Sequence, residues 1–158
     1  MTADEVQYAL TYSQSSPFYI RSHLVVPNVH WGLGFNHELD LLSISMDTHI
    51  GTEIEIKVTK ADMKRDLEKP HHHDDSRIRQ FYYAGPREIE AAFFEFAPPE
   101  AGIITISHEY GCRWNCRMRR NAKPRKYFKS FTPDEIMRLL RLGNMRYWSQ
   151  FHKQYRGK

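Results

Sequence analysis

The stretch "GTEIEIKVTKADMKRD", Gly51–Asp66, decides the fold because a strand-like pattern changes there into a helix-like one. Residues 52–59 alternate between apolar and polar side chains with the cleanest two-residue period in the chain, which predicts a strand. Residues 60–69 then predict a short helix that ends at Pro70, since proline cannot continue a helix. A strand followed directly by a helix is the expected centre of an α/β domain.

The polar face of this strand carries the residues of most chemical interest. Glu55 and Lys57 lie two positions apart on it, or about 7 Å along the backbone. Asp40 lies on the preceding predicted strand, residues 37–45, and the connection is short enough for antiparallel pairing. Cross-strand neighbours approach to within about 5 Å. The sequence therefore predicts that Asp40 and Glu55 could share one divalent cation.

Such an arrangement suits phosphodiester hydrolysis. Two carboxylates can hold Mg²⁺ while leaving positions for water and phosphate, and the metal would polarise the phosphoryl oxygen and acidify bound water. The Lys57 ammonium could orient the attacking water and offset developing negative charge. The main-chain carbonyl of Ile56, between the two side chains, is a candidate further oxygen ligand.

The spacing alone also fits ordinary surface charges, because an acidic residue two positions before a lysine is common. The chain contains a second example in Asp62 and Lys64. These two fall in the predicted helix, where residues two apart point to different sides. The strand context, Asp40 on the preceding strand and the helix that follows distinguish Glu55 and Lys57 from this pair.

"ELDLLSIS", Glu38–Ser45, together with the opening stretch resembles the core of the PD-(D/E)xK nuclease superfamily, which includes restriction endonucleases and Holliday-junction resolvases. In that pattern an Asp opens one strand and a Glu-x-Lys lies on the next, followed by a helix. Matched residue by residue, the resemblance implies Asp40 and Glu55 as metal ligands, Lys57 as the catalytic lysine, and Mg²⁺ or Mn²⁺ as cofactor. The chain departs from the pattern at Leu39, where the family often has proline.

The resemblance extends to "RQFYYAGP", Arg79–Pro86, and to residues 101–126, which are similar to small stand-alone bacterial and phage members. It implies a restriction-endonuclease-like fold, with a mixed central β-sheet flanked by helices. A glutamate on the first helix often completes the metal site, and Glu5 is the candidate here. Gln80 stands where some branches carry a glutamine beside the site. The resemblance also implies a bacterial or phage-infected host cytoplasm.

The whole chain, residues 1–158, is expected to form a single α/β domain. The predicted order of elements is αβββαβαβ(β)α. Pro27 is expected to end the first strand, Thr132 and Glu135 to form a capping box, and Gly143-Asn144 to kink or split the last helix. The other predicted elements are a helix at 4–12 capped by Thr2 or Asp4, strands at 18–29 and 76–85, a helix at 86–96, two strands around Tyr110–Gly111, and a helix at 132–155 with Ile136, Leu139, Leu140 and Trp148 as core contacts.

Charge is unevenly distributed along the chain. Residues 1–109 carry nine Lys and Arg against seventeen Asp and Glu, whereas residues 110–158 carry fourteen against two, so the two parts have net charges of −8 and +12. This polarity indicates that the C-terminal hairpin and helix bind phosphate; the alternative is a solvated basic hairpin with hydrophobic anchors. The candidate nucleic-acid-binding residues are Arg113, Arg117, Arg119, Arg120, Lys123, Arg125 and Lys126.

Two other clusters are weaker candidates for metal binding. The "HHHDD" run, His71–Asp75, is more typical of a solvated loop. His108, Cys112 and Cys116 have wider spacing than zinc sites and lack a fourth ligand. We interpret the two cysteines as reduced and partly buried. They do not form a disulfide framework.

These observations favour a cytoplasmic protein that does not associate with membranes, because the N-terminus does not resemble a signal peptide and no apolar run reaches a membrane span. The leading hypothesis is an Mg²⁺- or Mn²⁺-dependent deoxyribonuclease, an endonuclease in type. DNA is the expected partner, and a homodimer is compatible with the resemblance. Two alternatives remain: a non-catalytic nucleic-acid-binding protein with the same fold, and a phage protein-interaction or inhibitor module.

Overall fold

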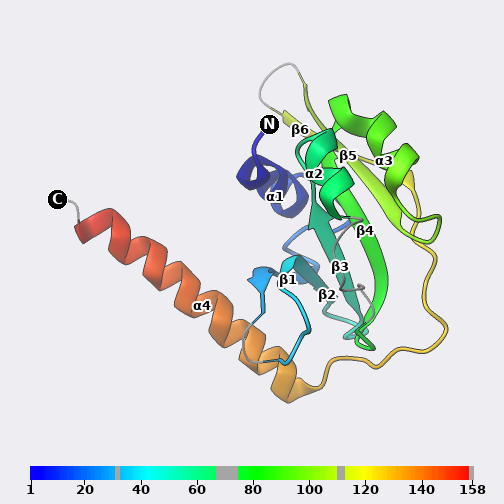
Figure 1. The fold of residues 1–158 in the computed structure, drawn as a ribbon. Coiled ribbons are helices and arrows are strands. Elements are labelled where there is room, and N and C mark those ends of the chain that lie inside the picture. The colour runs from blue at the N-terminus through cyan, green and yellow to red at the C-terminus, as the bar shows by residue number, and fades with distance from the viewer. Residues whose placement is uncertain (31–32, 67–74, 110–112, 157–158) are drawn as a thin grey trace.

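The computed structural model describes residues 1–30, 33–66, 75–109 and 113–156, and its centre is a six-stranded mixed sheet (Figure 1). The strands lie side by side in chain order. The α/β class and the predicted element order are confirmed. The elements are α1 (Ala3–Tyr12), β1 (His23–Val29), β2 (Leu39–Ser45), β3 (Gly51–Ile56), α2 (Lys60–Asp66), β4 (Ile78–Pro86), a 3₁₀ turn (Arg87–Ile89), α3 (Glu90–Phe96), β5 (Gly102–Glu109), β6 (Arg113–Arg120) and α4 (Pro133–Arg156).

Strand direction changes in the middle of the sheet. Strands β1, β2 and β3 form an antiparallel meander, whereas β3, β4 and β5 run parallel and β6 is antiparallel to β5. The parallel pairs require crossover connections, which α2 and α3 provide. Strand β3 therefore lies between the meander and the crossover half, and its two neighbours are β2 and β4.

One face of the sheet is covered by α1. Val6, Ala9 and Leu10 of this helix pack in one apolar cluster with Ile54 and Ile56 of β3. The helix begins as predicted, because the Thr2 side chain accepts a hydrogen bond from the main-chain N–H of Glu5 and the Glu5 side chain accepts one from Thr2. The alternation of side chains along β3 thus turns Ile54 and Ile56 towards the apolar side of α1.

The opposite face carries two separate apolar clusters. One, near the start of α4, contains Leu42, Ile44, Phe131 and Leu139. The other lies under α2 and α3 and includes Met63, Tyr83, Phe93 and Ile103. Because Leu42 is paired with Glu53 and Tyr83 with Glu55, the polar side chains of β3 lie between these two clusters.

Strand β1 differs from its prediction at both ends. It begins at His23 rather than residue 18, and it continues past Pro27 to Val29. Proline is tolerated because β1 is an edge strand of the sheet. On the outer side of an edge strand no neighbouring strand accepts a hydrogen bond, so the missing N–H of proline costs little.

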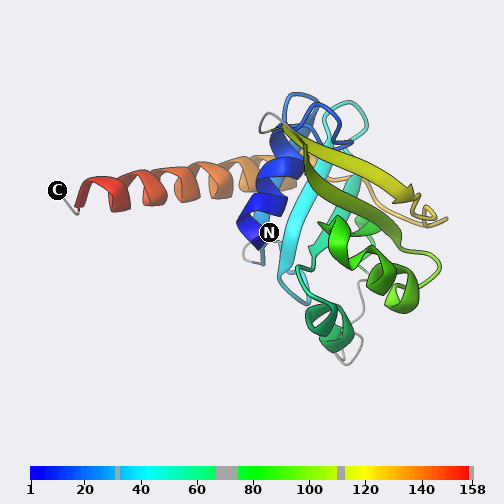
Figure 2. The same cartoon turned by 90° about the horizontal axis from the view of Figure 1, so that it is seen from above.

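The last helix also differs from its prediction. α4 begins with the predicted Thr132–Glu135 capping box, but it runs without interruption through Gly143 to Arg156. Leu139 is buried as expected, whereas Leu140 and Trp148 are 44% and 49% exposed. Leu140 lies about 100° around the helix from the buried Leu139, and Figure 2 shows α4 extending away from the rest of the domain towards its C-terminal end; these two predicted core contacts are therefore wrong.

Among the described residues, no helix is both long enough and apolar enough to cross a membrane.

Candidate active site

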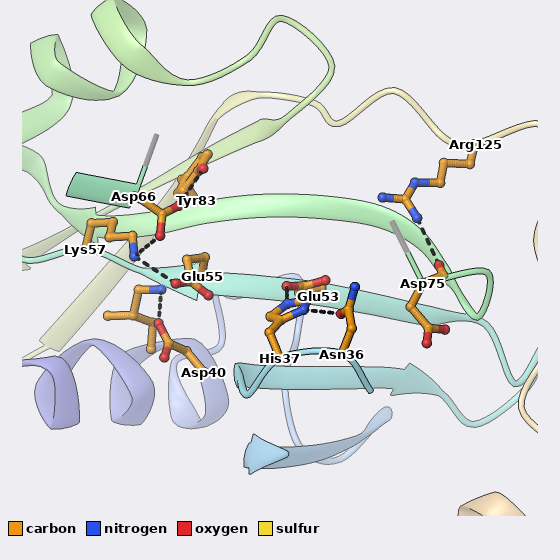
Figure 3. Close-up of polar contacts among 11 residues, drawn as sticks. Asn36, His37, Asp40, Glu53, Glu55, Lys57, Asp66, Asp75, Tyr83 and Arg125 are labelled. Carbon is orange, nitrogen blue, oxygen red and sulfur yellow. Dashed lines mark hydrogen bonds and ion pairs between the residues drawn. The ribbon is translucent and has the colours of Figure 1, made fainter. Parts of the chain in front are cut away.

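The predicted pair of carboxylates lies on adjacent strands. Leu41 of β2 is paired with Ile54 of β3, and continuing this antiparallel register by one residue sets Asp40 opposite Glu55. Asp40 also raises the pKa of Glu55 through its negative charge, which is the second cause of that shift after burial. The alternation along β2 and β3 therefore places both carboxylates on one face of the sheet (Figure 3).

The main chain of β3 fixes the position of Asp40. Its Oδ2 accepts a hydrogen bond of 2.8 Å from the main-chain N–H of Ile56, whereas the N–H of Lys57 points the other way and donates to Ala84 of β4 at 3.0 Å. In an extended strand the N–H and C=O of one residue project toward the same neighbouring strand. The carbonyl of Ile56, a predicted metal ligand, therefore faces the side of the strand on which Asp40 lies.

Lys57 lies at the centre of a buried charge cluster. Its Nζ is 2.7 Å from Glu55 Oε1 and 2.8 Å from Asp66 Oδ1, and the side chains of all three are at least 95% buried. Tyr83 donates a hydrogen bond of 2.8 Å from its hydroxyl to the second oxygen of Asp66 (Figure 3). β3, β4 and the C-terminal end of α2 together hold the lysine.

Burial and neighbouring charge shift the ionisation of this cluster. Burial raises the pKa of Glu55, Asp40 raises it further, and Lys57 partly offsets both. Burial alone would lower the pKa of Lys57, but the carboxylates of Glu55 and Asp66 outweigh it and the pKa is raised. Lys57 is therefore an ammonium at neutral pH and is suited to donate hydrogen bonds rather than to accept a proton.

A second buried polar pair lies along the same face. Glu53 is fully buried, and its Oε1 is 2.7 Å from His37 Nε2, while His37 Nδ1 is 2.6 Å from Asn36 Oδ1. Figure 3 shows this pair beside the Glu55–Lys57 cluster; Glu53 lies two positions before Glu55 on β3. The two clusters form a polar seam between the apolar clusters of this face.

The sequence did not identify Asp66, Tyr83 or His37 as site residues. For Asp66 a signal was present, because Met63 and Asp66 are three residues apart and therefore share one helix face. Both are buried, whereas Lys64 is exposed and Asp62 is 3.9 Å from the exposed Arg65. Thus Asp62 and Lys64 lie away from the cluster, as their helical spacing indicates.

Glu5 and Gln80 are not brought into the cluster. The exposed Glu5 is a capping residue of α1, whose helix packs on the opposite face of the sheet. Gln80 is paired with Thr52, two positions before Ile54, so it shares the α1 face and not the face of Glu55. Only the resemblance suggested that these two residues lie near the site; in the structure Glu5 caps α1 and Gln80 lies on the α1 face of the sheet.

The predicted basic residues of the C-terminal part divide into two groups. Arg120 donates to the carbonyls of Ala97, Pro98 and Ala101, and Arg125 donates to that of Asp75, so these two stabilise connections within the fold. The other five are exposed: Arg119 pairs with Glu90, Arg117 lies 3.9 Å from Glu109, and the remaining three are Arg113, Lys123 and Lys126.

The cysteine prediction is only partly covered by the structure. Cys116 is buried against α1, where its Sγ lies 3.4 Å from the carbonyl of Ala9, and burial raises the pKa of its thiol to about 11. The thiol is therefore protonated at neutral pH and is a poor nucleophile or metal ligand. Cys112 and His71–Asp74 lie outside the described residues.

The donor set of the cluster is compatible with a hard divalent cation. Two carboxylates and one main-chain carbonyl are oxygen ligands of the kind that Mg²⁺ or Mn²⁺ accepts, and water would supply the remaining ligands. A cation would also offset the repulsion between Asp40 and Glu55 that raises the Glu55 pKa. Within the described part of the chain, no group of three or more His, Cys, Asp or Glu side chains is arranged to hold a metal, so side chains alone would not complete the shell.

Comparison with protein-family models, with curated proteins and with solved structures gives no match for this chain.

Proposed function

We propose that this protein is a metal-dependent nuclease of the PD-(D/E)xK type that hydrolyses phosphodiester bonds in DNA. One observation carries the proposal: Asp40 and Glu55 lie opposite each other on paired strands, and the ammonium of Lys57 lies 2.7 Å from Glu55 in a buried seam. A restriction-endonuclease-like fold is part of the proposal. It is supported by the antiparallel meander followed by a parallel crossover strand.

Asp40, Glu55 and the Ile56 carbonyl would hold Mg²⁺ or Mn²⁺. When bound, the ion would polarise the scissile phosphate and lower the pKa of a coordinated water. Lys57 contributes directly, because its raised pKa keeps it protonated. Among the described contacts two of its three N–H donors go to Glu55 and Asp66, so the third can donate to a phosphate oxygen or orient the attacking water.

The basic C-terminal part is proposed to bind the DNA backbone. Arg113, Lys123 and Lys126 are exposed, and exposed cations that neutralise phosphates release counterions. Arg117 and Arg119 are engaged in exposed ion pairs, which contribute little to stability and can be exchanged for phosphate contacts.

A cleavage assay with matched variants tests the proposal. Linear, branched and single-stranded DNA would be incubated with Mg²⁺ or Mn²⁺ and with wild type, Asp40→Asn, Glu55→Gln or Lys57→Ala. The first two substitutions are isosteric, and the side-chain amide oxygen that each introduces can still accept the hydrogen bond that the carboxylate oxygen accepts in wild type. Each of the three variants should lose at least about 100-fold in rate.

The chain supplies its own controls in Asp62→Asn and Lys64→Ala, which repeat the Asp-x-Lys spacing outside the cluster. These variants should cleave like wild type. If all variants cleave DNA equally, the assignment of the three residues is wrong. If wild type binds DNA with a steep dependence on salt but never cleaves it, the protein is the non-catalytic alternative.

A further inference from the structure

Helix α4 has two faces with different surroundings. On the inner face Leu139 is buried, and Ile136 and Leu142 pack against the same apolar cluster of the sheet. Further along, Arg146 donates hydrogen bonds to the carbonyls of Pro27 and Asn28 on β1. The inner face therefore fixes α4 to the domain as far as Arg146, while both views show the C-terminal part of the helix projecting beyond the domain (Figures 1 and 2).

The outer face of α4 carries a row of apolar and aromatic side chains with one asparagine among them, which we call the α4 stripe. At about 100° per residue its members fall within about 60° of one line along the helix. Its apolar side chains are between 37% and 65% exposed. The α4 stripe consists of Met137, Leu140, Asn144, Tyr147, Trp148 and Phe151.

The spacing of the α4 stripe is that of a helix-pairing seam. Met137, Leu140, Asn144, Tyr147 and Phe151 follow one another at intervals of three, four, three and four residues, which is the heptad pattern of two helices packed side by side. A single Asn within such a seam fixes register and the number of helices at a cost in stability. The pattern therefore suits a second helix of the same kind.

The exposed area is sufficient for a weak dimer. A large aromatic side chain buries about 150–250 Å² when it is fully covered, so the exposed fractions of the α4 stripe leave roughly 500 Å² on each copy. Two copies would bury about 1,000 Å², which is the size of a weak or transient interface and about the minimum for a biological one. Aromatic residues and Met, which dominate the stripe, are enriched in the buried centres of such interfaces.

From these observations we infer that the α4 stripe is a homodimerisation surface, on which α4 of a second copy of this chain packs. Nothing in this inference depends on the nuclease proposal, because the stripe lies outside the Glu55–Lys57 cluster.

The charge of α4 makes the inference distinguishable from nucleic-acid binding. Residues 138–156 contain five Arg and Lys and no acidic residue. Two such helices repel each other, so salt should strengthen dimerisation by screening this repulsion. Binding of the same helix to DNA or RNA would be weakened by salt instead, since it depends on phosphate neutralisation.

Sedimentation of the full chain over about a hundredfold range of concentration tests the inference. Wild type should pass from monomer to dimer, and the midpoint should move to lower concentration as NaCl is raised. Tyr147→Glu/Phe151→Glu should remain monomeric throughout. Asn144→Leu should associate more tightly, because it replaces the polar residue of the seam.

Met145→Glu is the matched control, since Met145 is 57% exposed on the same helix but lies about 100° from the centre of the stripe. It should dimerise like wild type. Unchanged circular dichroism and melting temperature would show that each variant is folded. A monomeric wild type, or a double variant that still dimerises, would overturn the inference. So would a monomer whose RNA or DNA affinity falls in the double variant, because it would assign the stripe to nucleic acid.

Discussion

At the scale of single residues, the site depends on how Lys57 is held. A buried ammonium is costly unless it is paired, and Glu55 and Asp66 provide the two carboxylates. Glu55 is also a proposed metal ligand, so it must serve both the cation and the lysine. Asp66 lies on α2 and is oriented by the Tyr83 hydroxyl. We therefore regard Asp66 as the positioning residue for Lys57.

The Asp66→Asn variant tests that role. It keeps an oxygen near Lys57 but removes the charge that helps to raise the lysine pKa, so Lys57 should be less firmly placed. We expect kcat for DNA cleavage to fall about 10- to 100-fold with little change in KM. Tyr83→Phe, which keeps the ring packed beside Phe93, should reduce kcat less. Loss of DNA affinity in place of kcat would contradict a positioning role.

The raised pKa of Glu55 predicts the pH dependence of metal binding. A carboxylate must lose its proton to bind a cation, and burial together with Asp40 makes Glu55 keep its proton to higher pH than usual. Mn²⁺ affinity, measured by calorimetry, should therefore fall by up to about tenfold per pH unit as pH drops below this pKa. The Glu55→Gln variant should bind weakly and show no such step, whereas Asp62→Asn should behave like wild type.

At the scale of elements, β3 and β4 approach closely beside the cluster. A Cβ placed on Gly85 would overlap the main-chain carbonyl oxygen of Lys57 and come within 2.9 Å of the Phe93 ring. Glycine at this position therefore lets the end of β4 pack directly against the segment that carries the lysine. Strand β3 ends at Ile56, so Lys57 depends on β4 for the hydrogen bond that extends the ladder.

A Gly85→Ala substitution should therefore disturb both stability and the position of Lys57. We expect the free energy of unfolding to fall by about 2–3 kcal/mol, with loss of cleavage activity at temperatures where the variant is still folded. Gly143→Ala is the control of opposite sign, because a Cβ there meets no atom within 4 Å and Ala favours a helix by about 1 kcal/mol. Chemical denaturation of both variants would check these signs; a Gly85→Ala protein as stable as wild type would contradict the close packing.

Elements in which apolar and polar residues alternate regularly were predictable from the sequence, whereas contacts between distant elements were not. The alternation of residues 52–59 identified β3 and placed Glu55 and Lys57 on one face, and a short connection to β2 was enough to set Asp40 opposite Glu55. Alternation could not place Asp66 beside Lys57, because this contact depends on how α2 packs against the sheet. The Gly143-Asn144 pair predicted a kink or split, but the rest of α4 has sufficient helix propensity to continue through it.

At the scale of the whole molecule, the fold separates the proposed catalytic cluster from the basic residues that we propose to bind DNA. The carboxylates lie within the sheet, on the face between two apolar clusters, whereas the basic residues lie on the exposed hairpin and on α4. The charge counts predicted this division between the two parts of the chain. The charge counts could not show that Arg120 and Arg125 donate hydrogen bonds to main-chain carbonyls within the fold. In the sequence these two arginines do not differ from exposed cations.

We propose that Asp40 and Glu55 hold one catalytic cation, and a crystal structure of the protein soaked in Mn²⁺ would show whether they do. Anomalous scattering identifies the ion without assumptions about its ligands. We expect one strong peak between Asp40 and Glu55, at about 2.0–2.3 Å from their oxygens and close to the Ile56 carbonyl. A well-ordered crystal at saturating Mn²⁺ with no peak there, or with its peak at Glu53 and His37, would contradict it.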